Sequence, residues 1–96
     1  MNRVQICSAA ATDFTESLCW YAERSPDLAL QFESEFDGAT SRIADSPDRF
    51  PAFDDRHRYL QMRRFPYLII YRQHGNTITI IAVAHTSRAP GFWRDR

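Results

Sequence analysis

Apolar residues near the start of the chain recur at the spacing of an amphipathic helix. Within residues 9–24 they lie three or four positions apart, at Ala11, Phe14, Leu18 and Tyr21. This spacing places them on one helical face, so we expect a helix over this range, with Ser8 as its cap. Polar and apolar residues alternate at positions 3–7, which predicts a short strand before the helix.

A second helix is expected to begin directly after the first. Ser25 suits the N-cap, Pro26 suits the first helical position, and the carboxylate of Asp27 suits the positive end of the helix dipole. The apolar face of this helix is predicted to contain Leu28, Phe32, Phe36, Ala39 and Ile43. Pro47 ends the pattern. Two helices with so short a break between them indicate an antiparallel helical hairpin.

The second half of the chain consists of short segments rich in aromatic and β-branched residues. After a loop at 47–57, these segments predict strands at 59–64, 67–72 and 77–84, with a tight turn at 74–76. The resulting order is strand, helix, helix, strand, strand, strand. This order predicts an α+β fold in which the helical hairpin packs on one face of a small antiparallel sheet, which the N-terminal strand joins.

The composition is that of an ordinary globular protein, with 44% hydrophobic and 25% charged residues. No linker or repeat interrupts the chain, so residues 1–96 are expected to form a single domain. The longest apolar run, at 80–84, is far shorter than the ~20 residues of a membrane helix. The N-terminal residues do not form a secretion signal. We therefore expect a cytoplasmic protein that does not contact a membrane.

The net charge of zero conceals a strong asymmetry. Residues 1–48 hold three arginines against nine acidic residues, a balance of −6, and residues 49–96 hold nine arginines against three acidic residues, a balance of +6. All basic residues are arginine, so no lysine is available as a base or nucleophile. The asymmetry favours a basic face that meets an acidic partner or a nucleic acid, or simply acidic helices beside basic strands.

Side chains that commonly ligate metals are few: Cys7, Cys19, His57, His74 and His85. No pair of them has the spacing of metal ligands, so we expect neither a bound metal nor another cofactor. No glycine-rich loop is present to hold a phosphate, and no small-molecule substrate is expected.

A histidine close to a serine can indicate nucleophilic catalysis, and His85 precedes Ser87 by two residues. Sequence neighbours rarely have the geometry of a catalytic triad, and no third orienting group is evident. The simpler interpretation is a histidine at the end of a strand whose ring bonds to the backbone.

Arginines and tyrosines are interleaved through the second half, at Arg56, Arg58, Tyr59, Arg63, Arg64, Tyr67, Tyr71, Arg72 and Arg88. This combination is typical of phosphate contact with base stacking. Alternatively, the tyrosines pack on the helices while the arginines pair with acidic residues of the first half. The large apolar pair Phe92-Trp93 either folds back over the sheet or offers a docking site, and the residues favour folding back.

Two stretches of the second half, RRFPYLIIY at 63–71 and IIAVAHTSRAPGFW at 80–93, resemble the RelE/ParE toxin superfamily of bacterial type II toxin–antitoxin systems. The first half agrees, with Trp20-Tyr21 near the end of the first helix and Ser25-Pro26 at the start of the second. The resemblance covers nearly the whole chain. It implies a small α+β toxin and a cognate antitoxin whose C-terminal segment wraps the toxin and blocks it.

The superfamily divides by target. Members like RelE cut messenger RNA at the ribosome by attack of a 2′-hydroxyl on the adjacent phosphate, whereas members like ParE poison DNA gyrase. By register, the positions that carry basic catalytic residues in the ribonucleases are Tyr59, Gln61 and Leu68 here, and none is basic. The late tyrosine of the ribonucleases is Phe92 in this chain. The resemblance therefore points to a ParE-like toxin that inhibits a macromolecular target, with gyrase favoured, and not to an enzyme.

Two alternatives stay open at the level of the sequence. One is a ribosome-dependent mRNA endonuclease that uses His85, Arg63 and Arg88 as its catalytic residues. The other is a degenerate, non-toxic module that retains only antitoxin binding. We expect Arg63, Arg64, His85 and Arg88 to form a polar cluster at one end of the sheet. Contacts to the target or the antitoxin are predicted at Arg58, Arg64, Tyr71, Arg72, Phe92 and Trp93.

Overall fold

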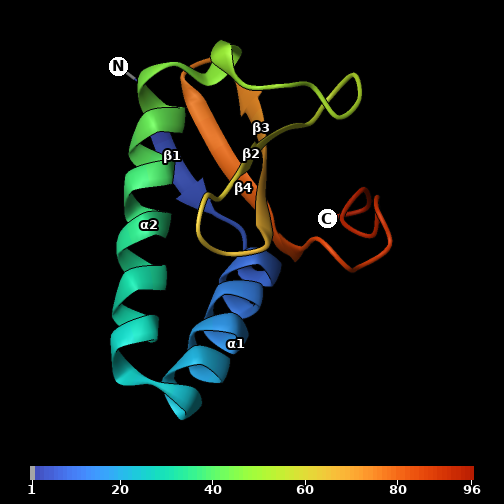
Figure 1. Cartoon of the computed structure of the whole chain (residues 1–96). Helices are drawn as coiled ribbons and strands as arrows, with labels where there is room; N and C mark the ends of the chain where they lie inside the picture. Colours follow the sequence, from blue (N-terminus) through green and yellow to red (C-terminus); the bar gives the residue numbers. More distant parts are fainter. Residues whose placement is uncertain (1) are drawn as a thin grey trace.

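The computed structural model describes residues 2–96 and contains two helices on one side of a four-stranded sheet (Figure 1). The elements in chain order are β1 (Arg3–Ile6), α1 (Ser8–Arg24), α2 (Pro26–Asp45), the 3-10 turn η1 (Pro47–Arg49), β2 (Arg58–Gln61), β3 (Tyr67–His74) and β4 (Thr77–His85). The predicted α+β class and the predicted order of elements are confirmed.

The sheet has the strand order β1-β4-β3-β2. The pairs β2/β3 and β3/β4 are antiparallel, and the β3/β4 hairpin turns at Gly75, whose φ of 59° favours glycine. The N-terminal strand joins the sheet as expected, but β1 runs parallel to β4, so the expectation of a wholly antiparallel sheet is wrong at this edge. The helices, β2 and β3 all lie between these two strands in the chain, and such a long connection lets neighbouring strands run parallel.

A single residue, Ser25, connects the two helices of the hairpin. Ser25 donates its N–H to the carbonyl of Tyr21 at 2.8 Å and accepts the N–H of Leu28 on its side-chain oxygen at 3.4 Å. Ser25 therefore ends α1 and caps α2, with Pro26 at the first position of α2, as predicted. The start of α1 differs from the prediction. Its N-cap is Cys7, which makes no side-chain cap bond, and Ser8 is already helical.

The main core lies between the helices and the sheet. Aromatic rings of α1, α2 and β3 meet there, for example Tyr21 and Phe32 at 5.3 Å and Phe32 and Tyr67 at 5.3 Å between ring centroids. The predicted faces are mostly correct, but Ala10 and not Ala11 is the buried alanine of α1, and Leu28 is exposed. The buried face of α1 also carries Asp13, a polar residue that the apolar pattern does not predict.

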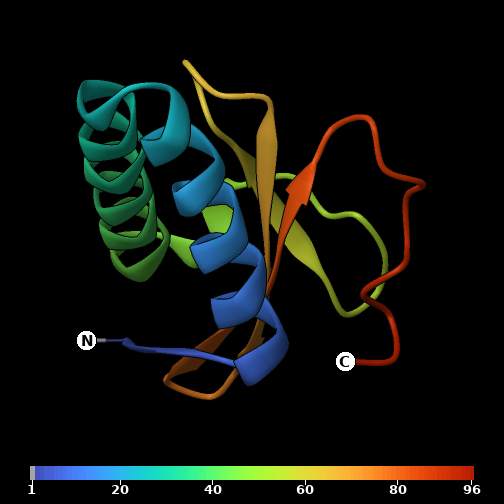
Figure 2. The same ribbon diagram turned by 90° about the horizontal axis from the view of Figure 1, so that it is seen from below.

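A second apolar cluster covers the opposite face of the sheet. It contains Ile70, Ile81, Ala82, Ala84 and Trp93, with Phe53, Tyr59, Leu68 and Phe92 packed against it. Figure 2 shows the helices on one side of the sheet, with the loop after η1 and the C-terminal segment on the other. The predicted folding back of Phe92-Trp93 over the sheet is confirmed.

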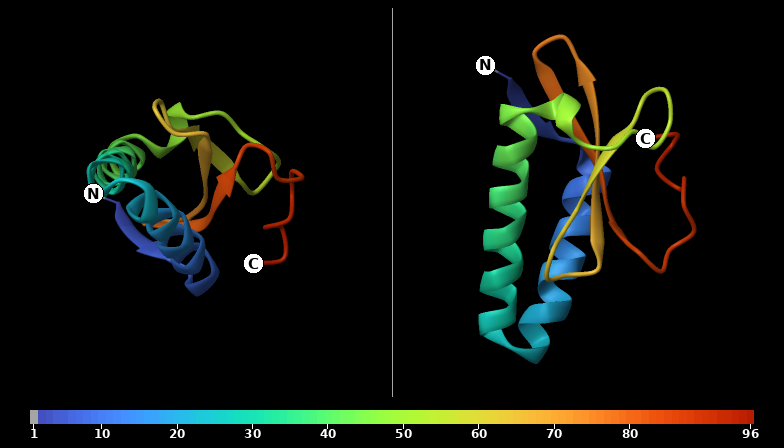
Figure 3. Two further views of the ribbon diagram at one scale, coloured as in Figure 1. Left: turned by 60° about the horizontal axis from the view of Figure 1, so that its bottom comes forward. Right: turned by 45° about the horizontal axis from the view of Figure 1, so that its top comes forward.

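The strand expected at 59–64 ends at Gln61. The chain turns there, and the Met62 N–H donates to the carbonyl of Tyr67 at 2.9 Å. Figure 3 shows this turn beside the helices and the β3/β4 hairpin at the other end of the sheet. Within residues 2–96, neither helix is both long and apolar enough to cross a membrane.

Candidate functional site

His85 is the last residue of β4 and lies opposite Tyr67 of β3, with the two rings edge to face at 5.1 Å. Its Nδ1 accepts the Ser87 N–H at 3.1 Å and lies 2.7 Å from the Ser87 hydroxyl. Because Nδ1 accepts a backbone N–H, the neutral ring carries its proton on Nε2. The expected backbone hydrogen bond to this histidine is therefore present.

His85 opens onto a hollow of about 490 Å³ between α1 and the ends of β3 and β4. The hollow is lined by Glu16, Ser17, Trp20, Tyr21, Pro66, Tyr67, His85 and Ser87. Of the residues described, no arginine lines it, and the carboxylate of Glu16 is its one formally charged group other than a protonated histidine. Its environment is aromatic and weakly acidic.

The two arginines of the β2–β3 turn face α2. The backbone N–H groups of Arg63 and Arg64 both donate to the carboxylate of Glu35, and Arg64 Nη1 donates to Gln31 Oε1 at 3.2 Å. Both arginines line a separate hollow together with Gln31, Ser34 and Glu35. Glu35 thus caps this turn and holds the arginines away from the hollow that His85 lines.

Arg88 is held by the C-terminal segment. Its guanidinium lies 3.6 Å from the centroid of the Phe92 ring, a cation–π contact. The predicted cluster of Arg63, Arg64, His85 and Arg88 is therefore divided between the α2 side, the hollow at His85 and the C-terminal segment.

Two of the predicted contact residues belong to the core. Tyr71 is 1% exposed and donates its hydroxyl to the carbonyl of Pro47. Burial raises the pKa of Tyr71 to about 12, although the neighbouring Arg58 opposes this effect. Trp93 is 2% exposed and packs against Phe53, with ring centroids 4.9 Å apart. Both side chains are buried in this fold, and their predicted contacts to the target or the antitoxin stay predictions.

The other predicted contact residues are more accessible. Arg58 is half-buried and donates from Nη1 to the carbonyl of Phe50 at 2.7 Å. Arg72 is half-buried on β3, and Phe92 is half-buried beside Trp93. Arg64 is exposed.

The sequence interpretation missed a buried histidine in the loop before β2. His57 is 3% exposed, and its Nδ1 lies 2.9 Å from Asp54 Oδ1, which also accepts the N–H groups of Arg56 and His57 at 2.8 Å. The Arg56 N–H is the main cause that lowers the pKa of Asp54 from 3.8 to about 2, partial burial opposes it, and the His57 ring adds to the lowering. The local spacing of aspartate and histidine in D-D-R-H is the signal that identifies this turn.

His57 Nε2 is buried and has no hydrogen-bond partner among the residues described. Within residues 2–96 no group of three or more histidine, cysteine or acidic side chains is placed to hold a metal ion. His57 therefore stands with Asp54 as a hydrogen-bonded pair and not as part of a ligand cluster.

Comparison with known proteins identifies the family. The family described as the ParE toxin of the type II toxin–antitoxin system parDE matches residues 4–90. The chain belongs to the ParE toxin family. It is similar to Toxin ParE2 of Mycobacterium tuberculosis, from strains CDC 1551 / Oshkosh and ATCC 25618 / H37Rv, with 29% identity over 90 residues, 93% of this chain and 86% of each relative.

A solved structure shares the fold of this ParE-family chain. It is a chain of the chromosomal ParDE system from P. aeruginosa, with a TM-score of 0.79 and 19% sequence identity over 91% of this chain and 98% of that one. The protein is thus a ParE-type toxin of a type II toxin–antitoxin system, and its family implies an antitoxin partner.

Proposed function

We propose that this toxin inhibits growth in the cytoplasm by binding DNA gyrase, and that its cognate antitoxin neutralises it. The family match and the similarity to Toxin ParE2 support a toxin of the ParE branch. Gyrase is the target that the sequence resemblance implies for this branch.

The single observation that carries the choice of target is the absence of a cation beside His85 among the residues described. Cleavage of a phosphodiester develops negative charge on the phosphate, and protein ribonucleases stabilise that charge with positive side chains or metal ions. The hollow at His85 instead contains Glu16, whose carboxylate repels a phosphate. This environment supports inhibition by binding and not RNA cleavage.

Residues of the β2–β3 hairpin also argue against RNA cleavage. Tyr59 and Leu68, at two positions where the ribonucleases carry basic residues, pack against the apolar cluster around Trp93. Gln61 lies opposite Leu68 and is uncharged. A substrate phosphate at the positions of Tyr59 and Leu68 would meet an apolar surface.

The helices offer the apolar surface that an antitoxin segment needs. Trp20 is 50% exposed, Leu30 64% and Leu28 37%, and all three lie on α1 or α2. Exposed apolar side chains on neighbouring helices suit a segment that folds on binding. We therefore propose that the antitoxin docks on the exposed apolar side chains of the helices.

The proposal is tested by inducing the toxin in cells without its antitoxin, while DNA integrity and transcript cleavage are followed in the same culture. We expect broken DNA with intact transcripts, in cells expressing either the wild type or His85→Ala. Cut transcripts with intact DNA, abolished by His85→Ala or Arg63→Ala, would instead establish the endonuclease. Normal growth, with binding to the antitoxin retained, would indicate the degenerate module.

A further inference from the structure

Most arginines of the basic half have no acidic partner. The ion pairs among residues 2–96 are His57–Asp54, Arg94–Asp54 and Arg96–Asp13. Only the pair formed by Arg96 joins the basic half of the chain to the acidic half. The interpretation that acidic residues of the first half neutralise the arginines of the second half therefore holds for Arg96 alone, and the other arginines of the second half have no acidic ion-pair partner from the first half among the residues described.

Three of these arginines border two adjoining hollows beside β3. The first, of about 420 Å³, is lined by Arg56, Arg58 and Tyr71 among others, and the second by Arg72, His74 and Thr79. Asp55, Arg56 and Gln73 line both hollows. We call Arg56, Arg58, Arg72 and Gln73 the basic strip.

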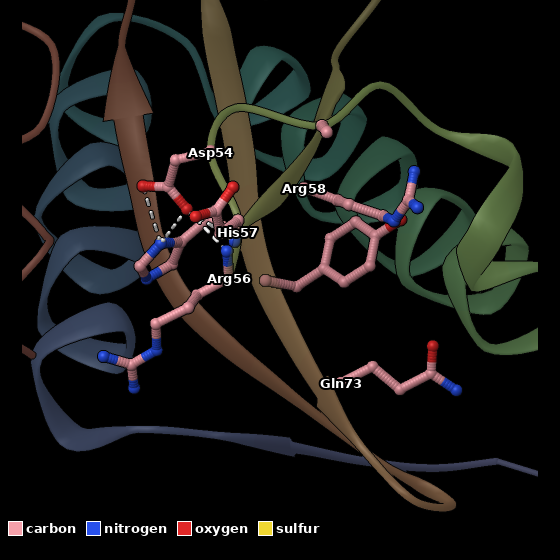
Figure 4. Close-up of a pocket in the computed structure, with 8 residues that line it drawn as sticks. Asp54, Arg56, His57, Arg58 and Gln73 are labelled. Carbon is pink, nitrogen blue, oxygen red and sulfur yellow. Dashed lines mark hydrogen bonds and ion pairs between the residues drawn. The ribbon is translucent and has the colours of Figure 1, made fainter.

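Most guanidinium donors of the basic strip are free, whereas Gln73 donates from Nε2 to the carbonyl of Gly75 at 3.2 Å. The guanidinium groups of Arg56 and Arg72 have no hydrogen-bond or ion-pair partner among the residues described, and Arg58 uses Nη1 alone, on the carbonyl of Phe50. Figure 4 shows the guanidinium groups of Arg56 and Arg58 extending in opposite directions, with Gln73 lower in the same view. A single small anion does not reach both diverging guanidinium groups, whereas successive anionic groups along a chain do.

Asp54 and Asp55 lie in the same loop and offset the positive charge of the basic strip to different extents. Asp54 is engaged by two backbone N–H groups, by His57 and, at 3.7 Å, by Arg94. Asp55 is exposed and lines both hollows, so it is the acidic group that opposes an anionic ligand there.

The chemistry of the surface indicates that the ligand of the basic strip is a polyanion and not a protein. The buried centre of a protein interface is usually apolar and is anchored by aromatic side chains together with arginine. The exposed large hydrophobic residues of the described chain are Ile6, Trp20, Leu28 and Leu30, which belong to β1, α1 and α2. The basic strip has no exposed apolar anchor. Its guanidinium groups and the side-chain amide of Gln73 are donors of the kind that bind phosphate oxygens.

We infer that the basic strip binds the phosphodiester backbone of a nucleic acid. This contact is additional to the proposed inhibition of gyrase and does not depend on it, because the ligand is the nucleic acid itself. Duplex DNA and single-stranded RNA share the chemistry, and the test distinguishes them.

The test is fluorescence anisotropy with purified toxin, using a labelled duplex DNA, a labelled single-stranded RNA and polyglutamate as a carboxylate polyanion. With three phosphate contacts, we expect the logarithm of the DNA association constant to fall with the logarithm of salt concentration with a slope of about −2.7. Arg56→Gln and Arg72→Gln are each expected to weaken binding about fivefold and to reduce the slope by about 0.9. Asp55→Asn is expected to tighten it.

Arg24→Gln is the matched control, because Arg24 is exposed at the far end of α1 with its guanidinium over the Trp20 ring. Binding of DNA alone, or of RNA alone, supports the inference and identifies the source of the phosphodiester. The inference is overturned if neither nucleic acid binds at low salt, if polyglutamate binds as tightly, or if Arg24→Gln weakens binding as much as the substitutions in the basic strip. Circular dichroism of each variant verifies that it is folded.

Discussion

Arg96 Nη1 lies 2.6 Å from Asp13 Oδ2, an ion pair between residues 83 positions apart in the chain. The same carboxylate oxygen accepts the N–H of Val83 at 3.1 Å, and Arg96 also donates to the carbonyl of Ile81 at 3.2 Å. Asp13 on α1 thereby contacts both the C-terminal segment and β4. The contact with β4 is at Val83, which follows the residues of β4 that pair with β1. The burial of Asp13 on an otherwise apolar helix face is explained by these partners.

Removal of this ion pair is expected to destabilise the fold. Arg96→Ala leaves the carboxylate of Asp13 buried without its cation, so the free energy of unfolding should fall by about 1.5–3 kcal/mol, measured by urea denaturation. Arg94→Ala is the control, because Arg94 is 59% exposed and lies 3.7 Å from Asp54. Its effect should stay within about 0.5 kcal/mol. Equal losses in the two variants would contradict a structural role for the Asp13–Arg96 pair.

The hydroxyl of Tyr71 provides a second test. Tyr71→Phe removes its hydrogen bond to Pro47, and we expect a loss of about 0.5–1.5 kcal/mol in the free energy of unfolding. Tyr59→Phe, at a half-buried tyrosine across the strand pair, should have a smaller effect. A loss for Tyr59→Phe as large as that for Tyr71→Phe would show that the hydrogen bond is not the cause.

The raised pKa of Tyr71 makes stability depend on alkaline pH. The unfolded tyrosine loses its proton near pH 10, whereas the folded one keeps it until about pH 12. The contribution of this group is therefore fully present below pH 10 and is lost as the pH rises toward 12. Urea denaturation from pH 9 upward should show a steeper loss for the wild type than for Tyr71→Phe.

The pKa of Asp54 is shifted in the opposite direction, so its contribution to stability is lost at acidic pH. Its pKa is lowered from 3.8 to about 2, so its contribution to stability is present above pH 4 and is lost as the pH falls toward 2. Asp54→Asn should lower the melting temperature at pH 6, and the difference from the wild type should shrink between about pH 4 and pH 2. Asp55→Asn serves as the control, since Asp55 is an exposed neighbour. A difference that stays constant with pH would contradict the pairing of Asp54 with the loop N–H groups and His57.

The two tryptophans should differ in both stability and fluorescence. Trp93→Phe leaves a gap in the cluster on the second face of the sheet and is expected to cost about 1–3 kcal/mol, whereas Trp20→Phe should cost less than about 0.5 kcal/mol. The emission that remains in Trp20→Phe should resist quenching by acrylamide, and the emission in Trp93→Phe should not. Equal quenching of the two variants would contradict the folded-back C-terminal segment.

Local signals in the sequence were sufficient for most of the secondary structure. The Ser25-Pro26 pair ends one helix and starts the next, and both effects depend on the conformation of those residues alone. The direction of β1 relative to β4 is a property of the whole chain path, so the local alternation at 3–7 predicted a strand but not its parallel pairing.

The candidate site was harder to predict, because long-range contacts decide where its side chains point. His85 lies at the end of a strand as expected, but Glu35 on α2 draws the turn of Arg63 and Arg64 toward the helices. The position of Arg88 depends on Phe92 after the chain folds back. Neither contact is visible in residue spacing, since each depends on elements that meet only in the folded protein.

The proposed target is tested most directly by the supercoiling of relaxed plasmid by purified gyrase in the presence of this toxin. We expect the wild type and His85→Ala to inhibit supercoiling to the same extent, and an excess of the cognate antitoxin to restore it. The same toxin preparation must form a complex with the antitoxin, which verifies that it is folded. Undiminished supercoiling at an excess of such a toxin would contradict gyrase as the target.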